Sequence, residues 1–225
     1  MTMAGHYIDL PVGEGIAVKD SFRRAYILRE SGRDENVHIV AGKDSITDLT
    51  FIVLPGVDAA IEVDVDIVGE GASVRIAGLY VSGSGEKVSI HTCMRHRVPG
   101  ASSHQIFTGI AGGSARVSFR GEITVAPDAQ KTQAYQKSRS LLLSGDARVE
   151  TMPQLEIYAD DVKCSHGATV GSLNQEEQFY MRSRGIPENE AKVLQMMSFL
   201  SPVLEGLPER DALAEELENA IRSIL

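Results

Sequence analysis

Alternating apolar and polar residues dominate most of the chain. Between residues 7 and 170 the period is close to two, as in residues 60–68, where apolar residues alternate with Glu62, Asp64 and Asp66. Clusters of Gly, Ser and Asp interrupt these runs. The pattern predicts consecutive β-strands separated by turns. By itself it is compatible with a sandwich, a barrel or a solenoid.

A partial internal repeat favours one of these architectures. Three similar segments begin at Ala72, Ala115 and Ala147, and each follows a turn rich in Gly, Ser or Asp. Each segment leads into a second short apolar stretch. The unequal separations suit stacked coils that carry loops of differing length, so a β-solenoid is the leading architecture. Chance matches between the strands of an antiparallel sheet are the alternative explanation.

After residue 171 the periodicity becomes helical. Asn174 is typical of a helix cap, and Gly185 can end the same helix in a left-handed conformation. A second helix is predicted from Pro187, which suits a first helical turn. Pro202 should bend or end that helix.

Apolar residues at helical spacing predict the buried faces of the second helix and of a third. In the second helix they recur every three residues, at Ala191, Leu194, Met197 and Leu200. In the third, within residues 208–225, they recur every four residues, at Leu213, Leu217, Ile221 and Leu225. Such stripes are more typical of a core than of a binding face. We therefore expect a β domain over residues 1–171 and a small helical domain over residues 172–225.

The overall composition argues against several classes of protein. A chain of 225 residues with 43% hydrophobic and 24% charged residues can bury a core, so disorder is not expected. The net charge of -9 argues against nucleic-acid binding and against binding to anionic membrane surfaces. The sequence shows neither a secretory signal nor an apolar run of about 18 residues. We therefore expect a cytoplasmic protein without a membrane span.

Catalytic motifs are missing from the sequence. It contains no phosphate-binding loop, dinucleotide fingerprint, zinc-peptidase motif or nucleophile elbow. Asp160 and Asp161 form an acidic pair, as in β-helix enzymes that cleave polysaccharides. Adjacent residues on a strand point to opposite faces, however, so a shared catalytic role for the pair is disfavoured. An enzyme is therefore not expected, and a β-helix hydrolase is the weakest of three interpretations.

The two cysteines, Cys93 and Cys164, do not have the spacing of a zinc finger, a thioredoxin motif or a disulfide framework. On a strand, Cys164 and His166 would share one face, with backbones about 6 to 7 Å apart. A thiolate and an imidazole suit iron or zinc, but a tetrahedral site would need further ligands from a second subunit. The alternative is that Cys164 is a small buried residue and His166 hydrogen-bonds locally.

The other histidines are weaker candidates for a site. His91 and Cys93 could share a strand face near His96, but the neighbouring arginines indicate a solvated strand end. A structural role is therefore favoured for this group. His104 lies beside two serines without an acidic neighbour, and supports no catalytic triad.

A long stretch around Cys164 and His166 has the pattern of a known family. It includes the Cys-Ser-His-Gly motif at residues 164–167, and it comprises residues 128–132, 141–144, 153–169 and 179–185. Through these segments the chain resembles the SufB/SufD family of iron-sulfur cluster assembly proteins, in a SufD-like form. Weaker similarity at residues 78–80 and 119–121 extends it over most of the β region.

The resemblance implies a right-handed parallel β-helix followed by a helical domain. It also implies a non-catalytic scaffold that pairs with SufB and recruits the SufC ATPase. The β-helix face with His166 would meet SufB near the site of cluster assembly, with Cys164 as its neighbour. Iron or a cluster would be held transiently, and not tightly by this chain alone. The SufC contact would involve Phe179, Tyr180, Arg182, Arg184 and Gly185.

Two features distinguish this chain within the resemblance. The cysteine that SufB-type members use for cluster assembly aligns near Ser138, which favours the SufD type. Family members usually carry a helical region before the β-helix, whereas this sequence begins almost directly with strands. An alternative is therefore a stand-alone homodimer that binds iron or a cluster, in which paired β-helix edges supply ligands in duplicate.

Overall fold

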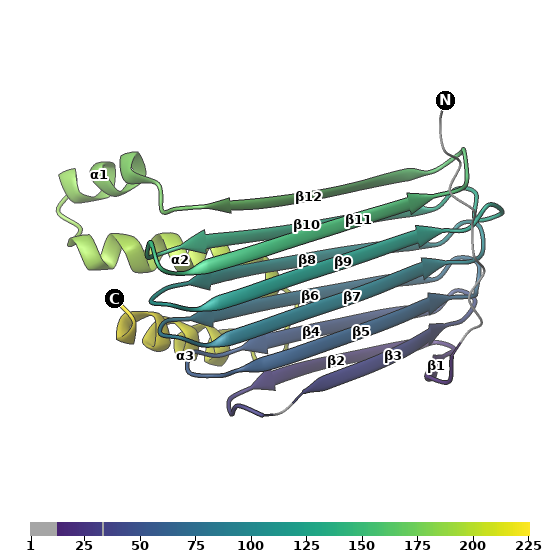
Figure 1. Ribbon diagram of the computed structural model, residues 1–225, viewed down its shortest axis with the longest axis horizontal. Coiled ribbons are helices and arrows are strands. Elements are labelled where there is room, and N and C mark those ends of the chain that lie inside the picture. The colour runs from purple at the N-terminus through teal and green to yellow at the C-terminus, as the bar shows by residue number, and fades with distance from the viewer. Residues whose placement is uncertain (1–12, 33) are drawn as a thin grey trace.

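The computed structural model describes residues 13–32 and 34–225, and two stacked parallel sheets make up most of it (Figure 1). Successive strands alternate between the sheets, so odd-numbered strands form one six-stranded sheet and even-numbered strands form the other. Neighbouring strands within each sheet run parallel. Each coil thus contributes one strand to each sheet. The fold is a β-solenoid followed by helices, as expected.

The odd sheet comprises β1 (Ile16–Val18), β3 (Glu35–Ala41), β5 (Ala59–Ile67), β7 (Lys87–His96), β9 (Arg116–Val125) and β11 (Arg148–Ile157). The even sheet comprises β2 (Ser21–Leu28), β4 (Ile46–Val53), β6 (Ser73–Ser82), β8 (Ser102–Ala111), β10 (Gln133–Leu142) and β12 (Lys163–Gly171). Three helices follow, namely α1 (Gln175–Ser183), α2 (Glu188–Leu204) and α3 (Arg210–Ser223).

The pairing of adjacent coils confirms part of the predicted repeat. The segments that begin at Ala115 and Ala147 lead into β9 and β11, which pair with Arg116 opposite Arg148. The segment that begins at Ala72 leads into β6 of the even sheet, so its match to the other two is wrong. Strands of both sheets alternate apolar and polar residues in the same way, because both sheets turn one face into the same core. The alternation therefore does not distinguish a strand of one sheet from a strand of the other.

In the core of the β-helix, aromatic rings lie over glycines of the neighbouring strand in the same sheet. Tyr80 of β6 pairs with Gly109 of β8, and a Cβ at Gly109 would lie 1.9 Å from Tyr80 Cζ. The Tyr80 hydroxyl is hydrogen-bonded to Ser140 of β10 at 2.7 Å. Phe107 of β8 occupies the corresponding space beside Gly78 of β6. The ring–glycine contacts join adjacent coils, and the Tyr80 hydroxyl extends the contact to the coil after them.

The core becomes more polar towards the last coils. The glutamines of β8 and β10 continue an inward column that is apolar in β4 and β6. The Gln105 side-chain oxygen accepts a hydrogen bond from Thr92 at 2.8 Å. The last coils therefore bury less apolar surface than the first. In order of strands, the column consists of Leu49, Ile76, Gln105, Gln136 and His166.

Helices α2 and α3 pack against the outer face of the even sheet (Figure 1). Their buried side chains share a hydrophobic cluster with outward-facing residues of the sheet, among them Ile52, Leu79 and Ile110. Both faces of β4 and β6 are therefore buried beyond the first three residues of each strand, which explains why these later parts are mostly apolar. In the described part of the chain, no helix is long and apolar enough to span a bilayer.

The predicted caps of α1 are confirmed. The Asn174 side chain accepts hydrogen bonds from the backbone N–H groups of Glu176 and Glu177, at 2.9 Å and 3.3 Å. Gly185 adopts a φ of 89° just after the helix, a conformation that side chains with a Cβ rarely adopt. Both caps rest on local chemistry, which is why the sequence alone predicts them.

Pro202 does not end α2, which continues to Leu204. A proline has no N–H to donate to the carbonyl four residues earlier, here that of Ser198. The Ser201 hydroxyl donates to this carbonyl instead, at 3.0 Å. This replacement bond and the buried position of Leu204 allow the last turn to persist.

The buried face of α2 differs from the predicted stripe. Ala191 and Leu200 are buried as predicted and Met197 packs partly against the same cluster, but Leu194 is 46% exposed. The core-facing residues follow spacings of three and four, through Val193, Met196 and Leu200. A repeat of three alone drifts around a helix of 3.6 residues per turn, so it leaves the core face. In α3 the buried residues are those predicted, Leu213, Leu217 and Ile221, while Leu225 follows the helix and is exposed.

Candidate functional site

The last coil leaves one end of the β-helix uncovered in the described structure. Strands β11 and β12 are the terminal strands of the two sheets. Every residue of β12 is exposed except Cys164, which is half-buried. Backbone N–H and C=O groups at such an edge can pair with a strand of another chain. We call this surface, formed by β11 and β12, the open end.

Cys164 and His166 lie on the inward face of β12 at the open end. Cys164 pairs with Ala134 and His166 with Gln136, and both of these partners are buried inside β10. Cys164 packs partly against the core, whereas His166 is exposed. The structure therefore brings the two predicted ligands to one face of one strand.

The chemistry of this pair limits what the chain can bind by itself. Burial raises the pKa of the Cys164 thiol, and a backbone hydrogen bond at Ala134 partly opposes this effect. The thiol is therefore protonated at neutral pH, and a metal would have to displace the proton. Among the described residues, no group of three or more His, Cys, Asp or Glu could hold a metal ion. Two donors leave a tetrahedral site incomplete.

Ser138, which the resemblance predicts to align near the cysteine of SufB-type members, lies on the inner face of β10. It pairs with Phe107 of β8 and Ala168 of β12. Only 4% of its surface is exposed. This position therefore faces the interior of the β-helix, one coil before the open end.

Helix α1 presents the other predicted contact residues. The helix has no buried residue, and Phe179 and Tyr180 are 74% and 59% exposed. The Arg184 guanidinium lies over the Tyr180 ring, 5.2 Å from its centre. Arg182 approaches Glu188 of α2 at 3.6 Å. These side chains form an exposed surface of aromatic rings and arginines, which we call the α1 surface.

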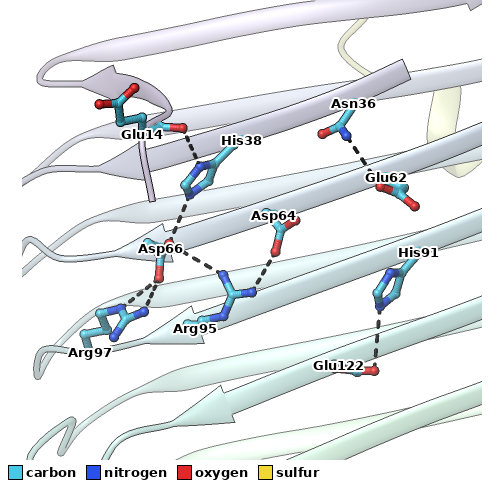
Figure 2. A network of polar contacts seen from close by, with 10 residues as sticks. All are labelled: Glu14, Asn36, His38, Glu62, Asp64, Asp66, His91, Arg95, Arg97 and Glu122. Atoms are coloured by element: carbon cyan, nitrogen blue, oxygen red, sulfur yellow. Dashed lines mark hydrogen bonds and ion pairs between the residues drawn. The ribbon is translucent and has the colours of Figure 1, made fainter. Parts of the chain in front are cut away.

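The outer face of the odd sheet carries a charged network (Figure 2). The Asp66 carboxylate is 1% exposed and accepts a hydrogen bond from Arg97 at 2.7 Å. It also faces His38 at 3.0 Å and Arg95 at 3.5 Å. Arg95 donates to Asp64 at 2.7 Å. The arginine cations offset part of the cost of burying the Asp66 carboxylate, and the network leaves no free carboxylate at Asp66.

The sequence alone does not predict this network. The arginines that follow Cys93 suggest a solvated strand end, whereas in the structure they contact a buried carboxylate. The charged residues do alternate with apolar ones along β5 and β7, which indicates that they face outward. Their contacts can be predicted only when the register is known, which places Asp66 opposite Arg95.

His91 and Cys93 share the outer face of β7, whereas His96 points into the core. His91 approaches Glu122 at 3.6 Å, and burial raises the pKa of Cys93 to about 11. His96 is hydrogen-bonded to Ser103 at 2.8 Å, and burial lowers its pKa to about 4. A neutral thiol and a buried imidazole fit the structural role favoured for this group.

Asp160 and Asp161 lie in the turn before β12, so their predicted place on a strand is wrong. The Asp161 carboxylate forms an ion pair with Lys131 of the preceding coil. Its backbone N–H also donates to the Gln130 side chain at 2.9 Å. These contacts give Asp161 a structural role in joining two coils.

Comparisons with known proteins point to the family that the motif indicates. Residues 30–199 match the family model described as SUF system FeS cluster assembly, SufBD core domain. Escherichia coli SufD, an iron-sulfur cluster assembly protein, is 40% identical over 139 residues, which cover 62% of this chain and 33% of SufD. A SufBD family protein of Synechocystis is 39% identical over 126 residues, covering 56% of this chain and 28% of the relative.

A more distant relative matches nearly the whole chain. The chloroplastic protein ABCI7 of Arabidopsis thaliana is 29% identical over 226 residues, which cover 98% of this chain and 47% of the relative. The chain therefore spans less than half the length of these three relatives. The family model itself extends from just before β3 into α2, and so includes both the open end and the α1 surface. The chain belongs to the SufBD family of iron-sulfur cluster assembly proteins.

Proposed function

We propose that this chain is a SufD-like, non-catalytic scaffold that pairs with a SufB protein and recruits a SufC-like ATPase. The observation that carries the proposal is that the open end and the α1 surface are both uncovered and lie at the same end of the molecule (Figure 1). A scaffold needs two such docking surfaces. This role implies a cytoplasmic protein, as expected from the sequence.

The open end suits docking of SufB. Exposed apolar side chains accompany the unpaired strand edges, at Met152 and Ile157 of β11 and Val170 of β12. Apolar contacts combined with backbone pairing favour edge-to-edge association. Cys164 and His166 would then lie at the interface, where SufB could supply the missing ligands for transiently held iron or a cluster.

The α1 surface suits docking of the SufC-like ATPase. Phe179 and Tyr180 are exposed large apolar residues, and exposed aromatic residues beside arginines are typical anchors of protein interfaces. Gly185 closes the helix and allows the turn into α2. Because α1 has no buried residue, Phe179 and Tyr180 can be replaced without disturbing a core.

The test is the affinity of the ATPase for the Phe179→Ala variant, measured by calorimetry. We expect binding to weaken at least about tenfold, since truncating an aromatic anchor removes much of a local contact. Ile46→Ala is the matched control, because Ile46 is also exposed, at 52%, but lies on β4. Equal affinities of the wild type and Phe179→Ala would contradict the proposed contact.

A second candidate function is a homodimeric iron- or cluster-binding protein. It is favoured by the position of Cys164 and His166 on a terminal strand, because two-fold pairing through β12 would bring both pairs of donors to one interface. Metal analysis of the protein purified alone, without oxygen, tests this function. Metal that disappears in the double variant Cys164→Ser, His166→Ala supports it. Metal-free wild-type protein, or metal retained in the variant, contradicts it.

A further inference from the structure

A groove of about 810 Å³ opens on the outer face of the even sheet, beside the chain segment that follows α2. One register column of outward residues forms its floor, namely Arg75, His104, Tyr135 and Ser165. Ile106 and Lys137 lie two positions further along their strands. Pro202, Glu205 and Gly206 line the groove from the helical side.

Two aromatic rings contact one another in the floor. His104 of β8 and Tyr135 of β10 overlap as a tilted pair, with ring centres 4.9 Å apart and planes inclined by 35°. Tyr135 is half-buried and His104 is exposed. The open surface of such rings can stack against a planar ligand. The sequence around His104 does not reveal this contact, because Tyr135 lies on the next coil and is distant in sequence.

The groove also carries positive charge. Arg75 donates to Asp48 at 2.9 Å, and Arg23 approaches the same carboxylate at 3.6 Å, so two guanidiniums share one carboxylate. Lys137 has no ion-pair partner within the part of the chain that the structure describes. Of the described residues that line the groove, Glu205 is the one carboxylate. On a chain with a net charge of -9, this local excess of cations favours an anion.

We propose that this groove binds a small molecule that combines a planar ring system with an anionic group. The ring system would stack on Tyr135 and His104, and the anionic group would lie near Lys137 and Arg75. The wall at Pro202 and the side chain of Ile106 would exclude water from the other edge of the ring. The groove is lined by Ser165 and His166 of the open end but by no residue of the α1 surface. Binding can therefore be measured on the chain alone, whether or not the chain recruits an ATPase.

Titration of the full chain with adenosine 5′-monophosphate, followed by calorimetry, tests the proposal. The probe supplies both a planar base and a phosphate. We expect saturable binding with a Kd below about 1 mM. Adenosine and inorganic phosphate should each bind at least about tenfold more weakly, because each lacks one of the two contacts. Absence of saturable binding, or equal binding of adenosine, would overturn the proposal.

Two variants locate the binding on the molecule. Tyr135→Leu removes the stacking surface and Lys137→Gln removes the unpaired charge, and each should weaken binding at least about tenfold. Lys43→Gln makes the same change of charge at an exposed loop outside the groove and should bind like the wild type. The Tm of each variant establishes that it is folded. Unchanged affinity in both groove variants would place the ligand elsewhere and refute the assignment.

Discussion

Inside the β-helix, a single side chain can contact residues of several strands. The Tyr80 ring of β6 lies over Gly109 of β8, and its hydroxyl is hydrogen-bonded to Ser140 of β10. Burial raises the pKa of Tyr80 to about 12, so the phenol stays neutral and can hydrogen-bond to Ser140. One side chain thereby couples three successive coils.

This arrangement predicts that Gly109→Ala is destabilising. The added Cβ would overlap the Tyr80 ring, and overpacking of this kind costs about 1 to 3 kcal/mol of the free energy of unfolding. Gly145→Ala is the control, because a Cβ there meets nothing within 4 Å and should change stability by less than about 1 kcal/mol. Urea unfolding measures both variants. Equal stabilities would contradict the packing.

His96 predicts a loss of stability in mild acid. Burial lowers the pKa of the folded imidazole from its ordinary value of 6.5 to about 4. Between these values the unfolded chain binds a proton that the folded chain does not, so stability falls as the pH drops from about 6.5 to about 4. Between pH 7 and pH 5, His96 should lower the free energy of unfolding by about 2 kcal/mol.

Urea unfolding of the wild type and His96→Gln at both pH values measures this contribution. The variant should lose about 2 kcal/mol less than the wild type over the interval, since glutamine does not titrate. The variant His104→Gln changes an exposed imidazole and should keep the wild-type loss. The same loss in His96→Gln would show that another group causes the acid sensitivity.

Single residues differ in how far the sequence predicts their roles. Cys164 and His166 share a face simply because they are two apart on a strand, and local alternation predicts this. The contacts of Asp66, and the pairing of His104 with Tyr135, depend on which coils are adjacent and in which register. That register is set by loop lengths and core packing, so local sequence does not determine it.

At the scale of elements, the outer face of the even sheet and helix α2 depend on one another. The helix buries Val193, Met196 and Leu200 in the cluster that also contains Leu79 of β6. Removing apolar atoms from such a cluster leaves a cavity that the surrounding structure fills only partly. The docking of α2 should therefore contribute strongly to the stability of the chain.

The variants Leu200→Ala and Leu194→Ala test which face of α2 packs. Leu200 is fully buried, so its truncation should lower the free energy of unfolding by about 2 to 5 kcal/mol. Leu194 is 46% exposed, and its truncation should lower it by less than about 1 kcal/mol. Thermal or urea unfolding distinguishes them. A larger loss of stability for Leu194→Ala than for Leu200→Ala would contradict the packing described here.

The limits of sequence-based prediction at this scale have local causes. Both ends of α1 follow from capping residues, whereas the length of α2 depends on the hydroxyl of Ser201 replacing a bond that Pro202 cannot make. The sequence predicts strands correctly, but it does not assign them to the odd or even sheet. Both sheets face one core and share one alternation.

At the scale of the whole molecule, the β-helix and its attached helices carry two uncovered surfaces, the open end and the α1 surface. The first coils of the β-helix bury an apolar core, whereas its last coil leaves β12 exposed. Helices α2 and α3 attach to the even sheet, and α1 extends beyond it with no buried residue (Figure 1). This arrangement is the basis of the proposed scaffold function.

The composition of the complex formed with SufB and the SufC-like ATPase of the same organism tests this account most directly. The tagged chain is purified together with both proteins without oxygen, and size-exclusion chromatography with light scattering gives the mass of the complex. We expect one stable complex that contains the chain, SufB and the ATPase. A homodimer or monomer that retains neither partner would contradict the scaffold function.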